Sequence, residues 1–314
     1  MKVVIPGSIP QAAAGLLKKE GFKISILKDE SGQEELFSEI ADADAVISLI
    51  NQKFNSYIIE KMSRCKVIAN YGVGFNNIDV RYAREKGIIV TNTPDVLTDS
   101  TADLAIALML GCARKIIEAE NFVKQGKFRG WRPQLFLGTE LKNKIFGVIG
   151  AGRIGTAAAI RAHSFGMKII YYSKKENKHL EKVVKAKKVL LNSILRKADF
   201  ISLHLPLTNE TYHLLNKEKL NLIRPDAVLI NTARGEIVDE KELIDLLKQK
   251  KISAAGFDVF ENEPDLNPDL FKLDNVLLLP HIGSATKEDR SNMGLLEARN
   301  VGAVLKGKKP ITPV

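Results

Sequence analysis

The stretch Lys144-Ile145-Phe146-Gly147-Val148-Ile149 runs directly into Gly150-Ala151-Gly152-Arg153-Ile154-Gly155. An apolar run followed by glycines in the pattern GxGxxG predicts a strand, a tight turn and the start of a helix. In such a turn Gly150 permits the tight backbone, Gly152 lets a ligand approach it, and Gly155 lets the helix pack closely. Free amide groups at the helix start favour an anion. We therefore expect residues 150 and 152–155 to bind the pyrophosphate of a dinucleotide.

The end of the next predicted strand indicates which dinucleotide fits. An NAD-binding unit places an acidic residue ≈ 20 residues further on, where it binds the ribose hydroxyls. Here Ser173 stands 18 residues after Gly155 and is followed by Lys174 and Lys175. A hydroxyl and two cations suit a 2′-phosphate, which a carboxylate would repel. The sequence therefore predicts NADP as the preferred cofactor and NAD as the alternative, in which Glu176 swings back and the lysines form a solvated turn.

Short β-branched runs alternate with amphipathic stretches along the chain, which predicts parallel sheets covered by helices. The periodic run Thr98–Lys124 predicts one long helix leaving a first α/β unit, and the alternation restarts at residue 144. A final helix is expected over Lys287–Leu305. The predicted strands are Lys2–Pro6, Lys23–Leu27, Ala45–Ile50, Lys66–Asn70, Ile88–Thr91, Lys144–Ile149, Lys168–Ser173, Phe200–Leu205, Ala227–Asn231, Ala254–Val259 and Asn275–Pro280.

Length and composition favour a two-domain globular protein, with 314 residues of which 45% are hydrophobic and 27% charged. The longest apolar run, Leu104–Ala113, is shorter than the ~18 to 20 residues needed to cross a bilayer. Two cysteines supply neither a disulfide framework nor a metal clip. We therefore expect a cytoplasmic protein without a membrane partner or a metal.

The net charge of +10 could indicate a nucleic-acid binder. However, the lysines are spread along the chain, and acidic residues and valines interrupt the densest patch, Lys174–Lys188, which has no interleaved aromatic residues. The charge therefore favours anionic small molecules over nucleic acid.

A dehydrogenase that reduces a carbonyl needs a proton donor that titrates near neutral pH, and the sequence has five histidines. His281 ends the apolar run 276–280 and precedes a turn of small residues, at a strand end where open α/β sheets bind ligands. His204 also ends a strand, next to Pro206, and we expect His204 and Pro206 to contact cofactor without doing chemistry. His213 is expected at a helix start, and like the two remaining histidines it is interpreted as structural or exposed.

Two further strand-end turns carry polar groups. Arg234 follows the run 229–233 and could hold a carboxylate bidentately, whereas Glu263 follows 255–260 and could orient an imidazole. Each also has a plain interpretation, Arg234 as a surface charge and Glu263 as an acid before a proline.

Together these segments resemble the D-isomer-specific 2-hydroxyacid dehydrogenases over nearly the whole chain. Arg234 and Glu263 are separated by 29 positions, and Glu263 and His281 by 18. The resemblance implies that Arg234 binds a 2-keto acid, that His281 donates a proton to its carbonyl oxygen, and that Glu263 holds His281 in its acidic form. It also implies that Asp258 contacts the nicotinamide carboxamide, that Thr232, Ala233 and His281 to Gly283 line the same ring with Thr101 nearby, and that Arg234 also contacts the cofactor.

The resemblance also extends to the first part of the chain. The segment 70–79 looks like the family's substrate-carboxylate loop, with the amides of Val73 and Gly74 as the binding groups. The alternative is an ordinary glycine turn between a strand and a helix. The resemblance implies an α/β fold of two doubly wound parallel-sheet domains: a flavodoxin-like substrate domain (1–97 and 286–314) and a Rossmann NAD(P)-binding domain (98–285).

Within the family, residues 171–175, 93–99 and 131–138 are most similar to glyoxylate and hydroxypyruvate reductases. In that branch a tryptophan at the place of Trp131 reaches into the partner subunit, so a homodimer is implied; alternatively, Trp131 anchors an interdomain loop. The expected activity is NADPH-dependent reduction of a small 2-keto acid, glyoxylate or hydroxypyruvate. The alternatives are 3-phosphoglycerate dehydrogenase and, from another class, a dinucleotide-sensing corepressor.

Overall fold

The computed structural model describes residues 1–29 and 31–314. The chain divides into two compact units: unit 1 comprises Met1–Leu97 and Ser284–Val314, and unit 2 comprises Thr98–Gly283. The sequence predicted that the chain returns from the second domain to the first between residues 285 and 286, whereas in the structure it returns from unit 2 to unit 1 between residues 283 and 284.

Unit 1 is built on a five-stranded, wholly parallel sheet with the strand order β2-β1-β3-β4-β5. This order is the flavodoxin-like arrangement that the resemblance implied. The short β-branched runs put each strand within about two residues of its observed bounds. Four of the five strands are mostly buried, and a buried parallel strand is a nearly continuous apolar run. The strands are β1 (Lys2–Ile5), β2 (Lys23–Ile26), β3 (Ala45–Leu49), β4 (Val67–Tyr71) and β5 (Ile89–Thr91).

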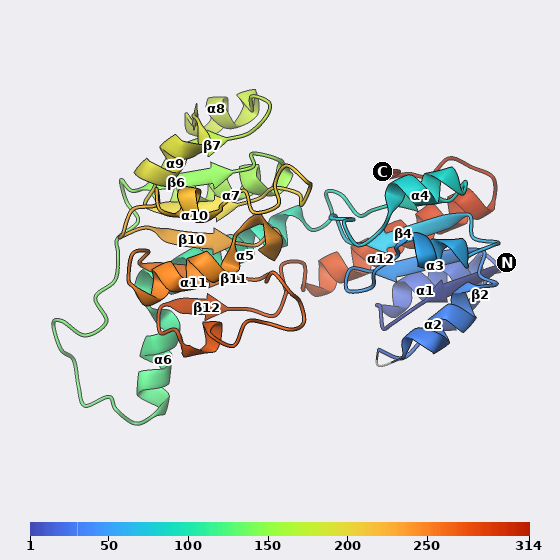
Figure 1. The fold of residues 1–314 in the computed structure, drawn as a ribbon, viewed down its shortest axis with the longest axis horizontal. Helices are drawn as coiled ribbons and strands as arrows, with labels where there is room; N and C mark the ends of the chain where they lie inside the picture. Colours follow the sequence, from blue (N-terminus) through green and yellow to red (C-terminus); the bar gives the residue numbers. More distant parts are fainter. Residues whose placement is uncertain (30) are drawn as a thin grey trace. The chain divides into compact units, whose positions relative to one another are not determined.

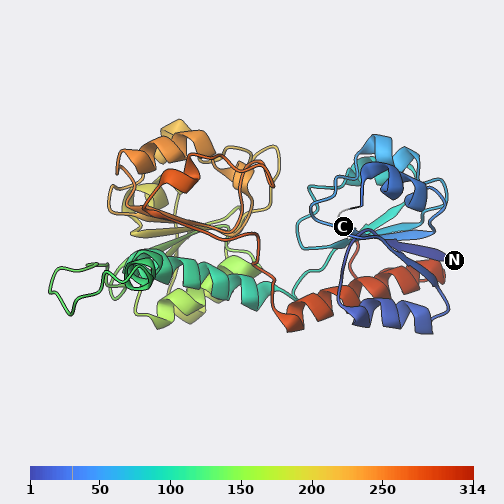
Figure 2. The same ribbon diagram turned by 90° about the horizontal axis from the view of Figure 1, so that it is seen from below.

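Helices cover both faces of this sheet. Figure 2 shows α1 and α12 on one face and the remaining helices of unit 1 on the other. The chain end returns to the sheet as well, since the Val314 amide donates to the Val90 carbonyl at 3.1 Å. The helices are α1 (Gln11–Lys19), α2 (Gln33–Ile40), α3 (Ser56–Glu60), α4 (Val80–Glu85) and α12 (Lys287–Leu305).

Unit 2 contains a seven-stranded parallel sheet with the order β12-β11-β10-β9-β6-β7-β8. The order reverses between β6 and β9, so their carboxyl ends meet at the switch point of a Rossmann fold. The predicted fold class is confirmed. The strands are β6 (Ile145–Ile149), β7 (Lys168–Tyr172), β8 (Lys187–Lys188), β9 (Phe200–Leu203), β10 (Val228–Asn231), β11 (Ala254–Phe257) and β12 (Val276–Leu278).

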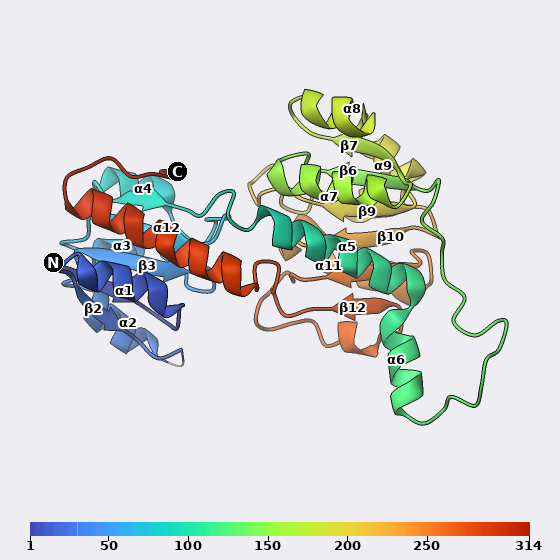
Figure 3. The ribbon, with the colours of Figure 1, turned by 180° about the vertical axis from the view of Figure 1, so that it is seen from behind.

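Two apolar layers sandwich this sheet. The helices α5 and α7 pack side by side on one face, as Figures 1 and 3 show, while α9 and α11 contribute to the cluster on the other. The helices are α5 (Thr98–Arg114), α6 (Ile116–Lys124), α7 (Arg153–Ser164), α8 (Lys178–Val184), α9 (Leu191–Lys197), α10 (Lys217–Leu220) and α11 (Glu240–Lys248), with short 3₁₀ turns at Gly235–Ile237 and Leu270–Lys272.

The single helix predicted over Thr98–Lys124 is wrong, because the structure breaks it at Lys115, whose φ is +52°. The returning chain explains the break. The amide of Thr139 donates to the carbonyl of Ala113 at 2.8 Å, in place of the helical donor expected four residues on. A side chain at Gly138 would collide with the same carbonyl. The contact from outside the helix therefore ends α5 and redirects α6.

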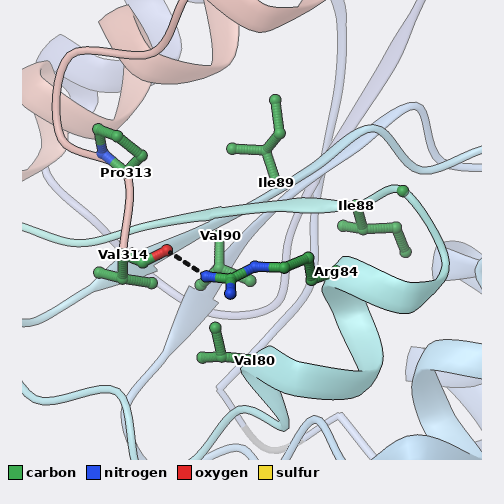
Figure 4. A pocket seen from close by; sticks show the side chains of 8 residues that line it. Val80, Arg84, Ile88, Ile89, Val90, Pro313 and Val314 are labelled. Atoms are coloured by element: carbon green, nitrogen blue, oxygen red, sulfur yellow. Dashed lines mark hydrogen bonds between the residues drawn. The ribbon is translucent and has the colours of Figure 1, made fainter.

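A pocket of about 260 Å³ lies in unit 1 between α4, β5 and the chain end (Figure 4). Arg84 donates from Nη2 to the carbonyl oxygen of Val314 across it, at 3.4 Å. None of the predicted site residues lines this pocket. Across residues 1–29 and 31–314, no helix is long and apolar enough to span a bilayer, and no group of three or more acidic, cysteine or histidine side chains is placed to hold a metal.

Candidate active site

The glycine turn after β6 is packed so that only glycine fits at two of its positions. Gly150 has φ +102°, and a Cβ there would lie 2.6 Å from the His204 carbonyl oxygen. A Cβ at Gly155 would collide with the Gly150 carbonyl. Gly152 differs, because a Cβ there would meet nothing within 4 Å at the point where α7 begins. The open space beside an uncovered helix start fits the pyrophosphate of a dinucleotide.

The sequence reasoning missed Asn177, which supports this turn from the segment after β7. Its Nδ2 donates to the Ala151 carbonyl at 2.9 Å and to Thr156 Oγ1 at 2.7 Å. Its Oδ1 accepts the Leu180 amide and so caps α8. An asparagine next to the lysine run signals such a cap in the sequence, but its contact with the glycine turn depends on the fold.

The end of β7 presents a hydroxyl and two lysines, as the sequence suggested. Ser173 is half-buried, whereas Lys174 and Lys175 are exposed. Lys174 forms an ion pair with Glu210, which comes from the segment after β9. This pair holds the pKa of Lys174 above its ordinary value and that of Glu210 below it.

His204 directly follows β9 and is half-buried, and its Nε2 lies 2.8 Å from the Ser202 hydroxyl. Burial lowers its pKa to about 4, so the imidazole is neutral at pH 7 and is no source of a proton. Its neighbour Pro206 is exposed, and the Pro206 carbonyl accepts the Thr211 hydroxyl at 2.7 Å. The backbone carbonyl of His204 therefore packs directly against Gly150 in the glycine turn.

His281 and Glu263 lie together in unit 2. Nδ1 of His281 is 2.8 Å from Oε2 of Glu263, and Oε1 of Glu263 accepts the Phe260 amide at 2.9 Å. Burial raises the pKa of Glu263, but the hydrogen bond and charge of His281, the Phe260 amide and the charge of Arg234 outweigh it and hold the pKa below its ordinary value. Glu263 is therefore an anion beside the imidazole, and Nε2 is the ring nitrogen left to serve a substrate.

The turn that carries His281 is fixed from two sides. Asp258 is buried at the end of β11 and accepts the Ile282 and Gly283 amides, both at 2.7 Å. Thr101 donates from its hydroxyl to the Gly283 carbonyl at 3.2 Å. The structure thus brings Thr101, Asp258 and Gly283 together, and these contacts hold His281, whose φ is +54°, in place.

Arg234 follows β10, with Nη1 donating to the Ala233 carbonyl at 2.7 Å. Burial lowers its pKa, which the charges of Glu263 and Glu236 oppose, and an arginine remains protonated at pH 7 in either case. The neighbouring Thr232 hydroxyl is buried and has no hydrogen-bond partner within the described chain. A buried hydroxyl in that state fits a polar group of a bound ligand, which agrees with the implied nicotinamide contact.

The loop at Val73 and Gly74 in unit 1 is held by two asparagines that the sequence analysis did not single out. Asn92 donates from Nδ2 to the Val73 carbonyl at 2.8 Å, and Asn70 donates to the Gly74 carbonyl at 2.9 Å. Since a peptide's amide points away from its carbonyl, fixing these carbonyls inward also fixes the direction of the neighbouring amides. The substrate-carboxylate role of Val73 and Gly74 stays a prediction.

Comparisons with known proteins agree with this arrangement. Residues 106–283 match the family described as D-isomer specific 2-hydroxyacid dehydrogenase, NAD binding domain. The chain belongs to this family. A glyoxylate reductase of Thermococcus litoralis is 47% identical to it, over 98% of this chain and 95% of that protein. The predicted family is thereby confirmed, as is an oxidoreductase that uses a nicotinamide dinucleotide.

Solved structures show the same likeness for this D-2-hydroxyacid dehydrogenase. A protein of Thermus thermophilus superimposes with a TM-score of 0.94 at 36% identity, covering 100% of both chains. An NADPH-dependent glyoxylate/hydroxypyruvate reductase of Sinorhizobium meliloti, in complex with NADP and malonate, superimposes with a TM-score of 0.88 at 31% identity, covering 100% of this chain and 96% of the other.

Proposed function

We propose that this dehydrogenase reduces glyoxylate or hydroxypyruvate to the D-2-hydroxy acid with NADPH. The observation that carries the proposal is the His281–Glu263 pair beside Arg234, at the carboxyl edge of a Rossmann sheet. The similarity to glyoxylate reductases supports the substrate, and the NADP-bound relative supports the cofactor.

Each residue of this site has a role in the proposed reaction. Arg234 binds the substrate carboxylate through its guanidinium fork. The reduced nicotinamide supplies the hydride. His281 gives the proton on Nε2 to the carbonyl oxygen, while Glu263 stabilises the imidazolium and orients the ring through Nδ1. Unit 1 is proposed as the substrate domain, in which the amides of Val73 and Gly74 bind the carboxylate.

The proposed cofactor site lies in unit 2. The glycine turn takes the pyrophosphate, the segment after β7 takes the 2′-phosphate of NADP, and the ends of β9, β10, β11 and β12 line the remainder. The residues are Thr101, Gly150, Gly152, Arg153, Ile154, Gly155, Ser173, Lys174, Lys175, His204, Pro206, Thr232, Ala233, Arg234, Asp258, His281 and Gly283.

We further propose a homodimer located in the cytoplasm. The dimer is supported by apolar side chains exposed on α6 and on the loop that follows, with Trp131 exposed to 84%. This apolar arm comprises Ile116, Ile117, Val123, Phe128, Trp131 and Leu137. Free thiols at Cys65 and Cys112 agree with a reducing compartment.

An assay of nicotinamide oxidation with purified enzyme tests the activity. The substrates are glyoxylate, hydroxypyruvate and 3-phosphohydroxypyruvate, each with NADPH and with NADH. We expect the highest kcat/KM with NADPH and one of the first two substrates. A preference for the phosphorylated acid would favour 3-phosphoglycerate dehydrogenase. Tight dinucleotide binding without turnover would favour a sensing protein.

A further inference from the structure

His213 contacts two loops of the active site at once. It lies in a turn after β9, half-buried, and not at the helix start that the sequence suggested. Its amide donates to the Glu236 carbonyl at 2.8 Å, two residues beyond Arg234. Its Nε2 lies 2.7 Å from Oε1 of Glu261, two residues before Glu263. One residue therefore joins the loop that carries Arg234 to the loop that carries Glu263.

The two joined loops also pack closely against each other. A side chain at Gly235 would collide with the backbone of Phe260 and Glu261. The Glu261 amide donates to Oε2 of Glu240, at the start of α11, at 3.2 Å. Because these contacts are close and directional, a shift of Glu261 is transmitted to Glu263 through the short intervening backbone.

The backbone at His213 is in an unusual conformation. Its φ of +44° lies in the left-handed region, which residues with a side chain adopt uncommonly, although histidine does so more often than most. The ring stacks on Tyr212 with centroids 4.2 Å apart and an interplanar angle of 11°. Such a conformation persists where surrounding contacts fix it, and it is found preferentially near functional sites.

We infer that His213 is a positioning residue for the reduction: its side-chain hydrogen bond with Glu261 and its backbone hydrogen bond to the Glu236 carbonyl fix Glu263 relative to Arg234. This inference rests on the proposed function for its kinetic part only. His213 itself touches neither substrate nor cofactor in this scheme. It acts through Glu263, whose carboxylate orients His281.

The following charged groups act on His281, Glu263 and Glu261. His281 faces Glu263 directly, and the charge of Asp258 also acts on it; Arg234 acts on Glu263. His213 faces Glu261, and Glu240 lies behind Glu261. A displaced Glu263 leaves the protonated form of His281 with a weaker partner, so His281 would lose its proton at a lower pH.

The test compares His213→Ala, His213→Gln and Glu261→Gln with the wild type, using the full chain. NMR titration of the His281 ring, assigned with His281→Gln, needs no substrate. We expect the titration to move to lower pH in His213→Ala and to return towards the wild-type value in His213→Gln, whose amide can donate to Glu261. For kcat with glyoxylate we expect a loss of about 10-fold to 100-fold in His213→Ala, the scale of a small misplacement, with NADPH affinity changed less than about 3-fold.

His163→Ala is the matched control, since it also removes an imidazole with one hydrogen bond in unit 2, at the far end of α7. It should change neither the titration nor kcat. If His213→Ala fails to fold, Glu261→Gln and His213→Gln still test the inference. In these two variants we expect smaller shifts of the His281 titration in the same direction. An unmoved His281 titration in the folded variants overturns the inference. Wild-type enzyme that turns over none of the keto acids overturns the proposed function instead, while the titration still tests the role of His213.

Discussion

At the scale of single residues, the reduction depends on one proton on Nε2 of His281. Replacing His281 by alanine removes that donor and leaves the glycine turn, which lies on a different loop, untouched. We expect turnover with glyoxylate to fall by about 10² to 10⁴, the range for a positioned acid. NADPH affinity, measured by fluorescence titration, should stay within a few-fold of the wild type. A variant that kept more than a tenth of the turnover would exclude His281 as the donor.

Glu263→Gln tests the partner of that histidine through pH. Glu263 is ionised at neutral pH because its pKa is held below the ordinary value, and its charge favours the protonated imidazole. Reduction needs that protonated form, so activity falls as pH rises through the titration of His281. The neutral amide removes the favourable charge, and the alkaline limb of kcat/KM should therefore move to lower pH. Glu242→Gln on α11 is the control, and a limb that stays in place would contradict the pairing.

At the scale of elements, the segment after β7 should set the choice between cofactors. The double variant Ser173→Asp, Lys174→Ala introduces a carboxylate that binds ribose hydroxyls and repels a 2′-phosphate. Because Lys174 is exposed and paired with Glu210, the expected loss of kcat/KM with NADPH is at the low end, about 10-fold, together with a gain with NADH.

The measurement is kcat/KM for both cofactors at one ionic strength, since salt screens these charges. Lys178→Ala, another exposed lysine a few residues further along, serves as the control. A wild type that already prefers NADH would refute the assignment before any substitution.

The sequence predicted those elements whose signals are local. The glycine turn, the span of α12 and all strands except the two-residue β8 follow from short patterns that need no knowledge of the fold. The break at Lys115 was not predictable in this way, because it depends on Thr139 reaching back to Ala113. The same holds for the pair of His213 with Glu261, which are 48 residues apart. Arg234, Glu263 and His281 were found because each stands in a turn after an apolar run and because the three segments together resemble one family.

At the scale of the whole molecule, the apolar arm should hold two copies together. Replacing both Trp131 and Leu137 by glutamate puts charges where apolar contact is needed. We expect light scattering to give a dimer for the wild type and a monomer for this variant. Val183→Glu, also exposed and apolar but on α8, should remain dimeric. A monomeric wild type would refute the dimer.

A buried acid in α12 should make stability depend on pH. Burial raises the pKa of Glu297 to about 8, against hydrogen bonds from Thr91 at 2.6 Å and Asn300 at 3.1 Å. Between the unfolded value and about 8, only the folded state keeps this proton, so stability falls as pH rises, by at most about 1.4 kcal/mol per pH unit. Glu297→Gln copies the neutral acid and should remove this part of the slope.

Urea unfolding of wild type and variant between pH 5 and about 8 gives the comparison. Equal slopes in the two proteins would show that Glu297 is ionised in the fold.

Unit 1 draws its last helix from the far end of the chain, and this arrangement sets an order of events during synthesis. All residues of unit 2 are available once residue 283 has emerged from the ribosome. At that point the sheet formed by the first 97 residues still lacks α12 on one face. Unit 2 therefore has all its residues available before unit 1 does, which is the opposite of the usual amino-terminal-first order. Throughout the translation of unit 2 the nascent amino-terminal part lacks the helix that packs on β3, β4 and α1, and it is this uncovered face that a chaperone at the ribosomal exit would have to shield.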